Sequence, residues 1–446
     1  MKILEEALTR SVRYLEGLST RTVEPSSTST AALERLGGTL ADEPTSASEV
    51  LERLDALGSP ATVGNAGPRY FGFVTGGALP VSLAANWLAG AWDQNAHFVV
   101  GSPTAAAIEN VALDWIREIL ELPPVWGGGF VTGTTMGNFS GLAAARHRVL
   151  EKAGWDVEAR GLFGAPEIQV VVGEEAHTTL FQGLALVGFG RERVIKVPVD
   201  DQGRMRADQF PELTTPAIVC LQAGNVNTGG FDPIADIADR VHGTGAWIHV
   251  DAAFGLWAKA SAAKAHLVAG IDRVDSIATD LHKWLNVPYD AGLALYRDPD
   301  AARNALSITA AYLPSGAERQ PCDYTPESSR RARGVEVWAA LAHLGRSGLA
   351  ELIDRNCRFA ERFADGLRKS GFTIASDVVL NQVLVSFGDD ARTKEVISAV
   401  QQEGTCWCGG TTWKGRSLMR ISVSSWATTE EDVDRSLEAI IRVATG

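Results

Sequence analysis

Between residues 168 and 296 the chain repeats one pattern, in which a short apolar run is followed by a stretch with helical character. The apolar runs cover residues 168–172, 193–197, 217–221, 246–250, 276–279 and 292–296. Strand–helix alternation of this kind favours an α/β fold, a mostly parallel sheet with helices on both faces. In such sheets functional side chains gather beyond the carboxyl ends of the strands. We therefore look for chemistry in the segments that follow each run.

Length and charge limit the possible partners. The chain has 446 residues, of which 45% are hydrophobic and 21% charged, which suits a large α/β domain with smaller appendages. A net charge of −13 argues against a broad surface for nucleic acid or anionic membrane. Residues 1–10 alternate charged and apolar side chains and resemble neither a signal peptide nor a membrane span. We expect a cytoplasmic protein with a small-molecule substrate.

The cysteines indicate a reducing compartment and no metal. There are five, an odd number, and most are scattered, so a framework of disulfides is not expected. The close pair Cys406 and Cys408 has no second Cys or Cys/His pair to complete a zinc site. The sequence therefore predicts no metal centre.

Asp251 and Lys283 are the strongest candidates for chemistry. Asp251 follows the run at 246–250, so a parallel strand would deliver its carboxylate into a crevice. Lys283 lies between His282 and Trp284, where partial desolvation would lower the pKa of its amine and favour a Schiff base. Either residue alone also fits a turn carboxylate or a solvated surface lysine.

Together the two residues suit pyridoxal phosphate (PLP). A carboxylate keeps the pyridine nitrogen of PLP protonated, and a lysine binds its aldehyde. The triplet His282-Lys283-Trp284 resembles that of the PLP-dependent group II decarboxylases, which include aromatic amino acid, histidine and glutamate decarboxylases. The resemblance implies an L-amino acid substrate and a homodimer with active sites at the subunit interface. It also implies the aminotransferase-type fold (fold type I), with a seven-stranded sheet and a small C-terminal α+β domain.

A glycine-rich segment at 126–138 opens a helix and carries hydroxyl side chains. Backbone N–H groups and the positive end of a helix suit an anion such as the cofactor phosphate, although glycine turns before helices are also common for structural reasons. The segment resembles the family's phosphate loop, which implies that Thr134 and Thr135 bind the phosphate. Met136 and Gly137 depart from the acidic residue and alanine that usually follow.

Further cofactor contacts follow from the resemblance. His177, after the run at 168–172, matches the family's imidazole that stacks on the cofactor ring and takes part in catalysis. Asn225 stands where the family has a hydroxyl residue, and it can still donate a hydrogen bond. Ala253 ends the Asp-Ala-Ala motif and counts among the cofactor-binding residues. We expect His282 to contact the phosphate, and we assign Asp280 no such contact because a carboxylate cannot donate.

The substrate pocket is predicted by position in the family pattern. Phe73, Thr75, Trp92 and His97 would form one wall, although aromatic residues near turns are more often core. Arg420, on an otherwise apolar strand, would grip the substrate carboxylate, with a structural salt bridge as the alternative. This mixture leaves aromatic, aliphatic and acidic amino acids open as substrates.

The segment at about 310–330 is rich in Pro, Gly and Ser, which favours a mobile lid. In the family the lid tyrosine protonates the substrate carbon after carbon dioxide leaves. Tyr324 matches that residue through the preceding Asp323 and the following arginine run that ends at Arg333. The alternative is a tyrosine that only packs.

The sequence thus predicts three segments and one reaction. Residues 1–66 form a helical segment and an expected dimer contact, 67–333 the large PLP-binding domain, and 334–446 a linking helix with the small domain. The predicted reaction is decarboxylation of an L-amino acid to an amine. The alternatives are oxidative decarboxylation to an aldehyde, another fold-type-I lyase or aminotransferase reaction, and a cofactor-free scaffold or binding protein.

Overall fold

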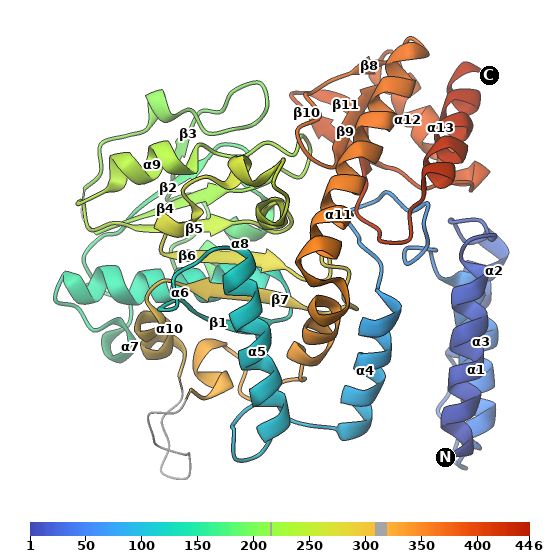
Figure 1. Cartoon of the computed structure of the whole chain (residues 1–446), viewed down its shortest axis with the longest axis horizontal. Helices are drawn as coiled ribbons and strands as arrows, with labels where there is room; N and C mark the ends of the chain where they lie inside the picture. Colours follow the sequence, from blue (N-terminus) through green and yellow to red (C-terminus); the bar gives the residue numbers. More distant parts are fainter. Residues whose placement is uncertain (215, 308–318) are drawn as a thin grey trace. The chain divides into compact units, whose positions relative to one another are not determined.

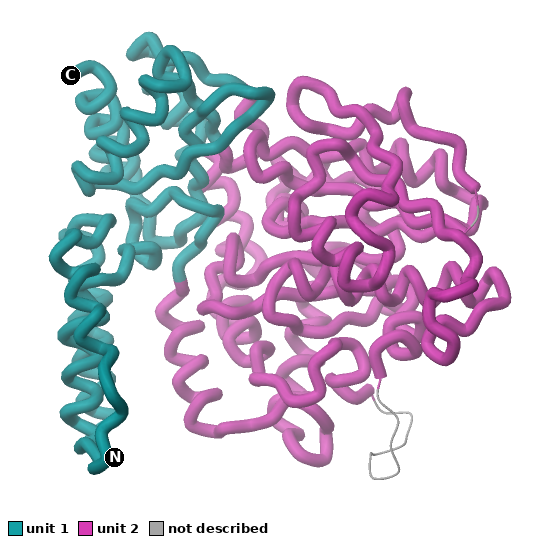
Figure 2. The backbone as a smooth tube through the Cα atoms, turned by 180° about the vertical axis from the view of Figure 1, so that it is seen from behind, with its two compact units in different colours: residues 1–77, 359–375, 383–446 teal, residues 78–358, 376–382 magenta. Residues whose placement is uncertain are grey.

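The computed structural model describes residues 1–214, 216–307 and 319–446 (Figure 1). The chain divides into two compact units, shown in different colours in Figure 2. Unit 1 comprises residues 1–77, 359–375 and 383–446, and unit 2 comprises 78–358 and 376–382. The N-terminal helical segment and the C-terminal domain thus share one unit, a division that differs from the three predicted segments.

Contacts between residues far apart in the sequence hold unit 1 together. The Arg69 side chain forms a buried ion pair with Asp432 at 3.2 Å, and Val23 N donates a hydrogen bond to Gly404 O. Such pairs leave no periodic signal in the sequence, which explains why the predicted boundaries followed chain order instead.

Unit 2 is built on a seven-stranded sheet, as predicted, with the order β1-β7-β6-β5-β4-β2-β3. The pairs from β3 to β6 are parallel, whereas β7 runs antiparallel to both of its neighbours. The strands are β1 (Gly127–Val131), β2 (Gln169–Gly173), β3 (Ile195–Val197), β4 (Ala217–Gln222), β5 (Trp247–Asp251), β6 (Ser276–Asp280) and β7 (Gly292–Tyr296).

Helices of unit 2 cover both faces of this sheet. Ala294 and Tyr296 of β7 pack into the apolar cluster that contains the side chains of α6 (Thr134–Lys152). The alternate residue Leu295 lies on the opposite face, where a Cβ at Gly128 would meet both Leu295 and Leu113 of α5 (Pro103–Ile119). Burial on both faces explains why the strands are continuous apolar runs rather than alternating ones.

Helix α6 lies close against the sheet and contacts strands β4 to β7. A Cβ at Gly137 would come within 2.9 Å of Ala278 Cβ, and one at Gly141 within 2.6 Å of the His249 ring. Both positions therefore need glycine for the close approach. As a result the N-terminus of α6 is fixed at the edge of the sheet where β5 and β6 end.

The glycine run before α6 corrects one prediction. Residues 127–131 form strand β1, so only Thr132 and Gly133 make the turn into the helix. A Cβ at Gly129 would lie 2.5 Å from Tyr324 O, so this glycine serves close backbone packing. Composition alone did not separate a glycine strand from a glycine turn.

Unit 1 carries a second, four-stranded sheet with the order β10-β11-β9-β8. Its strands are β8 (Thr373–Ile374), β9 (Gln382–Ser386), β10 (Gly409–Trp413) and β11 (Arg416–Ser422). Before β10, Trp407 forms an isolated bridge with Tyr70. The helices of this unit are α1 (Lys2–Gly17), α2 (Ser27–Ala31), α3 (Ala47–Ala61), α12 (Asp390–Glu403) and α13 (Glu430–Thr445).

The remaining helices belong to unit 2, apart from the longest one. Helix α11 (Gly334–Lys369) begins in unit 2 and ends in unit 1, with a break in helical geometry at Gly345. The others are α4 (Pro80–Trp92), α7 (Val157–Arg160), α8 (Thr178–Leu186), α9 (Ile234–Val241) and α10 (Pro299–Leu306). Among the described residues, no helix is long and apolar enough to cross a membrane.

We predict that Leu142→Ala destabilises the protein by about 2 to 5 kcal/mol, because it leaves a cavity beneath α6 that close packing cannot refill. Leu142 is fully buried. The matched control is Leu186→Ala in the exposed last turn of α8, which should change the unfolding free energy by less than about 0.5 kcal/mol. Urea unfolding measures both; equal midpoints for the two variants would contradict the packing described.

Candidate active site

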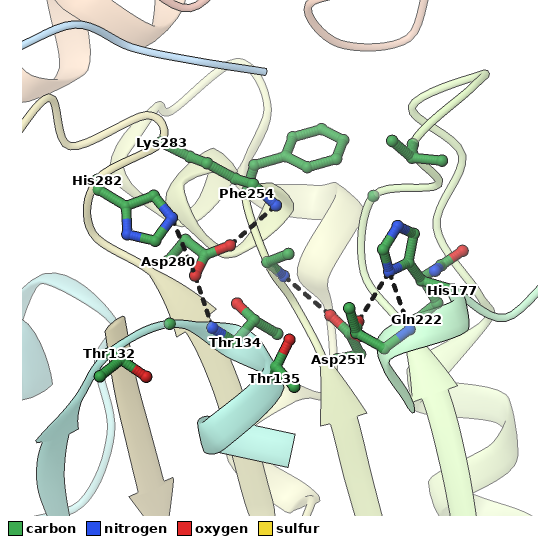
Figure 3. A pocket seen from close by; sticks show the side chains of 15 residues that line it. Thr132, Thr134, Thr135, His177, Gln222, Asp251, Phe254, Asp280, His282 and Lys283 are labelled. Carbon is green, nitrogen blue, oxygen red and sulfur yellow. Dashed lines mark hydrogen bonds and ion pairs between the residues drawn. The ribbon is translucent and has the colours of Figure 1, made fainter. Parts of the chain in front are cut away.

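A pocket of about 320 Å³ opens in unit 2 where β4, β5 and β6 end and α6 and α8 begin (Figure 3). It brings together residues from loops that are far apart in the sequence. Its lining consists of Thr132, Gly133, Thr134, Thr135, His177, Thr179, Gln222, Gly224, Val226, Asp251, Ala253, Phe254, Asp280, His282 and Lys283. Most of the predicted cofactor-binding residues are among them.

The Lys283 amine forms an ion pair with Asp280, at 2.8 Å between Nζ and Oδ2. Burial alone would lower the pKa of Lys283, but the Asp280 carboxylate outweighs burial and raises it above the ordinary value. The predicted lowering of this pKa was therefore wrong. The reason is the Asp280 carboxylate, whose ion pair with Lys283 was not predicted.

Asp280 also joins the lysine to the start of α6. Its Oδ1 accepts a hydrogen bond of 2.6 Å from Thr134 N, the first residue of the helix. Burial would raise the pKa of Asp280, but Lys283 and then His282 outweigh burial and hold it below the ordinary value. One carboxylate thus stabilises both the ammonium group and the positive end of the helix.

His282 is held in a neutral form beside this pair. Its Nδ1 accepts a hydrogen bond from Ala291 N, so the ring proton of the neutral form lies on Nε2, which is 3.5 Å from Asp280 Oδ1. Burial lowers its pKa more than Asp280 raises it. The Tyr289 ring stacks on the imidazole, with centroids 4.3 Å apart. His282 can therefore act as a hydrogen-bond donor without carrying charge.

Asp251 ends β5 and presents its carboxylate to the pocket. Asn138 Nδ2 donates to Oδ2 at 2.8 Å, and Ala253 N donates to Oδ1 at 3.2 Å. Burial raises the pKa of Asp251, although His177, Asn138 and Lys283 act in the opposite direction. A cation placed against this carboxylate would relieve the cost of burial.

His177 reaches the pocket because it is the N-cap of α8. Its Nδ1 accepts a hydrogen bond from Thr179 N at 3.3 Å and lies 2.7 Å from Thr179 Oγ1. Capping with a ring nitrogen fixes the imidazole at the helix entry. Figure 3 shows His177 and Asp251 on one side of the pocket, and Lys283, His282 and Asp280 on the other.

The chemistry of this lining fits PLP. The Thr134 hydroxyl is buried and has no hydrogen-bond partner within the described ranges, so it can donate to an anion at the start of α6. Across the pocket Asp251 is a buried anion that a pyridinium would neutralise, and Lys283 is an amine that can bind an aldehyde. The pocket therefore contains a complementary group for each end of the cofactor.

Comparison with known proteins identifies the family. Residues 33–388 match the family described as "Pyridoxal-dependent decarboxylase conserved domain". The chain belongs to this family. It is a PLP-dependent amino acid decarboxylase, and pyridoxal phosphate is its cofactor.

Relatives span most of the chain. Tryptophan decarboxylase 1 of Oryza sativa subsp. japonica is 28% identical over 422 residues, which cover 85% of this chain and 81% of the relative. The 4-hydroxyphenylacetaldehyde synthase of Rhodiola rosea is 26% identical over 360 residues, covering 75% and 72%. The crystal structure of Oryza sativa TDC with PLP and tryptamine shares the fold, with a TM-score of 0.92, 23% identity and coverage of 100% and 97%.

Asn225, a predicted cofactor-binding residue, does not line the decarboxylase pocket. Its Nδ2 donates to Gln222 Oε1, and its Oδ1 accepts from Asn227 N and Thr228 N. The side chain is thus used to hold its own loop, while the neighbours Gly224 and Val226 line the pocket. An Asx turn of this kind is a common use of asparagine after a strand.

The predicted substrate residues are spread over both units. In unit 2, Trp92 is an exposed residue at the end of α4, and His97 Nε2 lies 3.1 Å from Ser328 Oγ; neither lines the pocket. In unit 1, Phe73 packs against Trp407, while Thr75 and Arg420 are buried. The substrate-binding role of these residues stays a prediction.

Tyr324 lies in the short helix η6 (Pro321–Tyr324) and does not line the pocket of its own chain. Its carbonyl accepts a hydrogen bond of 3.1 Å from Tyr296, and the Arg319 guanidinium lies over its ring. Burial raises the pKa of its phenol. Residues 310–318 of the predicted lid lie outside the described residues, and the role of Tyr324 stays a prediction.

Sequence reasoning missed the roles of Asp280, which lines the pocket, and of Asn138, which does not line it but donates a hydrogen bond to Asp251. Asp280 gave a signal, an acid three residues before the lysine, but it was judged only as a phosphate ligand. Asn138 gave none, because its role depends on how α6 lies against β5.

We predict that Asp280→Asn lowers the pKa of Lys283 in the cofactor-free protein, because burial then acts without the carboxylate that opposes it. The pH dependence of reductive methylation, followed at the Lys283 peptide by mass spectrometry, measures this pKa. The control is Asp290→Asn, which removes a carboxylate that is not paired with Lys283. An unchanged Lys283 pKa in Asp280→Asn would show that the ion pair does not set it.

The ion pair also has a defined pH window. The pKa of Asp280 is lowered, so the stability that the ion pair contributes is lost as pH falls through the pKa of Asp280. The pKa of Lys283 is raised, so the same contribution is lost as pH rises through the pKa of Lys283. The pair therefore stays charged across the neutral range.

Proposed function

We propose that this decarboxylase converts an L-amino acid to its amine and carbon dioxide at the pocket around Lys283. The observation that carries the proposal is that one pocket collects Lys283, Asp251, His177 and the start of α6. When bound, PLP supplies an aldehyde that condenses with amines and a ring that accepts the electrons of the broken Cα–carboxylate bond. The substrate side chain is aromatic, aliphatic or acidic.

The protein residues hold charge and orientation for this reaction. Lys283 supplies the amine that binds the cofactor, and Asp280 keeps that amine protonated in the free protein. Asp251 holds a positive charge on the ring nitrogen, which makes the ring a better electron acceptor. His177 would pack against the ring, and Thr134, Thr135 and His282 would donate hydrogen bonds to the phosphate.

The aldehyde-forming reaction is the second candidate, and the 4-hydroxyphenylacetaldehyde synthase relative favours testing it. Both reactions release carbon dioxide, but only the aldehyde-forming reaction also consumes dioxygen and releases ammonia and peroxide. Assay of all products on a panel of aromatic, aliphatic and acidic amino acids separates the two. Tyr324, as the proposed acid, favours the amine.

We also propose a homodimer whose sites are completed across the interface. An exposed apolar stripe supports it: Leu4, Leu8 and Val12 of α1 are 60%, 47% and 41% exposed and recur at intervals of one helical turn. Such a stripe on a charged helix is typical of a surface that another chain covers.

A cytoplasmic location is part of the proposal and rests on the odd number and scatter of the cysteines.

Lys283→Ala should abolish borohydride-dependent attachment of the cofactor and reduce amine formation to background, because the amine that binds the aldehyde is gone. In the wild type, reduction followed by digestion should label the peptide that contains Lys283. The control is Lys259→Ala, which removes a lysine paired with Glu121 outside the pocket and should leave labelling unchanged. Labelling of another lysine in Lys283→Ala would refute the assignment.

Tyr324→Phe should lower amine formation by about 10²- to 10⁴-fold, the usual contribution of a general acid, while release of carbon dioxide falls less. If the acid acts across the dimer interface, mixing this variant with Lys283→Ala should restore activity. Random exchange would give about a quarter of the wild-type sites, since half of the dimers are hybrid and each has one complete site.

Each variant exchanged with itself is the control for this mixture and should recover nothing. Full amine formation by Tyr324→Phe would eliminate Tyr324 as the acid, and Tyr312, outside the described residues, would be tested next. An inactive Tyr324→Phe that the mixture does not rescue would place the acid in its own chain.

A further inference from the structure

Behind Asp251 lies a chain of buried hydrogen bonds that the reaction described above does not use. Asn138 Oδ1 lies 2.9 Å from His249 Nε2, and His249 Nδ1 lies 2.8 Å from Ser276 Oγ. Trp247 Nε1 donates to the same Ser276 Oγ at 2.8 Å. The chain connects strands β5 and β6 to α6 and ends at the Asp251 carboxylate.

The donors in this chain all point the same way. A carboxylate only accepts, so Asn138 must turn its NH₂ to Asp251 and its carbonyl oxygen to His249. His249 must then donate from Nε2, which leaves Nδ1 as an acceptor for the Ser276 hydroxyl. The hydroxyl oxygen in turn accepts from Trp247. Every donor therefore faces toward Asp251.

Burial fixes the charge of the central imidazole. His249, Asn138 and Ser276 are fully buried, and burial lowers the pKa of His249 to about 3. The ring is therefore neutral at any pH at which the enzyme works, and it keeps one donor and one acceptor. A protonated ring would have two donors, of which one would face the Ser276 hydroxyl that now donates to it.

The packing around the imidazole is specific to it. A Cβ at position 141 of α6 would lie 2.6 Å from both Cε1 and Nδ1 of His249, so Gly141 leaves room for the ring. The helix turn that carries Gly141 also carries Asn138 toward β5. The hydrogen bonds and the close approach of the helix thus depend on the same side chain.

We propose that His249 is a positioning residue that fixes the orientation of the Asn138 amide, so that Asp251 presents its carboxylate to the cofactor ring nitrogen. This rests on the proposed function in one respect, the role of Asp251 as the partner of that nitrogen. Without the donor on His249, the Asn138 amide is free to turn its oxygen to Asp251, and two acceptors then repel each other. Removal of the His249 donor therefore weakens the hydrogen bond from Asn138 to Asp251, although His249 does not line the pocket.

The test compares His249→Phe with His249→Gln. Phenylalanine keeps the ring and removes both nitrogens, whereas glutamine keeps an amide donor for Asn138 Oδ1. We expect His249→Phe to weaken PLP binding by the cofactor-free enzyme and to lower kcat by about 10- to 100-fold, the range found for residues that orient a ligand-binding side chain. KM should change less than kcat, and His249→Gln should recover most of both losses.

Two further variants act as references. Trp247→Phe removes only the far end of the chain and should leave PLP affinity within about twofold of the wild type, since the link from His249 to Asn138 is intact. Asn138→Asp keeps the side-chain volume but cannot donate to Asp251 as an anion, so it should lose PLP affinity as His249→Phe does. If His249→Phe does not fold, His249→Leu replaces it, because leucine also lacks a donor for Asn138 Oδ1.

Asp251→Asn tests the role of Asp251 separately from the role of His249. If Asp251→Asn binds PLP and turns over normally, the proposed role of Asp251 fails, and the role of His249 fails with it. If Asp251→Asn is impaired but His249→Phe matches the wild type, only the positioning role is overturned. Equal losses in His249→Phe, His249→Gln and Trp247→Phe would also overturn it, because they would reflect general damage to the core.

Discussion

The close approach of α6 to the large sheet is the constraint on which the active site depends. Gly137 and Gly141 allow the helix to lie against β5 and β6, and Gly133 meets Gly292 at its start. A side chain at position 292 would come within 2.5 Å of Gly133 Cα. Because the helix cannot shift without a clash, its first residues stay at the edge of the sheet where Asp251 and Asp280 end their strands.

This arrangement places two buried carboxylates at one end of a helix and gives them different partners. Asp280 is neutralised within the protein by Lys283 and Thr134 N, so its pKa falls. Asp251 accepts hydrogen bonds from Asn138 and Ala253 N, and burial raises its pKa although His177, Asn138 and Lys283 oppose burial, so it still favours an added positive charge. Asp280 thus holds the lysine, and Asp251 is suited to the cofactor ring.

The same geometry explains why some of the predicted cofactor-binding side chains line the pocket and one does not. His177 and Thr134 line the pocket because each lies at a helix start whose position the strand–helix order already fixes. Asn225 lies in a loop of similar position, but its side chain forms hydrogen bonds to Gln222 and to Asn227 and Thr228 of that loop. The pKa of Lys283 was predicted in the wrong direction because desolvation was considered without its nearest charge.

The sequence by itself determined the α/β class, the strands from β2 to β7, and the segments that carry Lys283, Asp251 and His177, because buried parallel strands leave continuous apolar runs and functional residues follow them. It did not determine that residues 127–131 are a strand, or that the N-terminal helices and the C-terminal domain share a unit. Nor did it reveal the pair of Asp280 with Lys283 or the chain from His249 to Asp251. The shared unit and the contact of His249 with Asn138 join segments more than a hundred residues apart, and the pair of Asp280 with Lys283 depends on the direction of a side chain. Only tertiary packing decides these distances and directions.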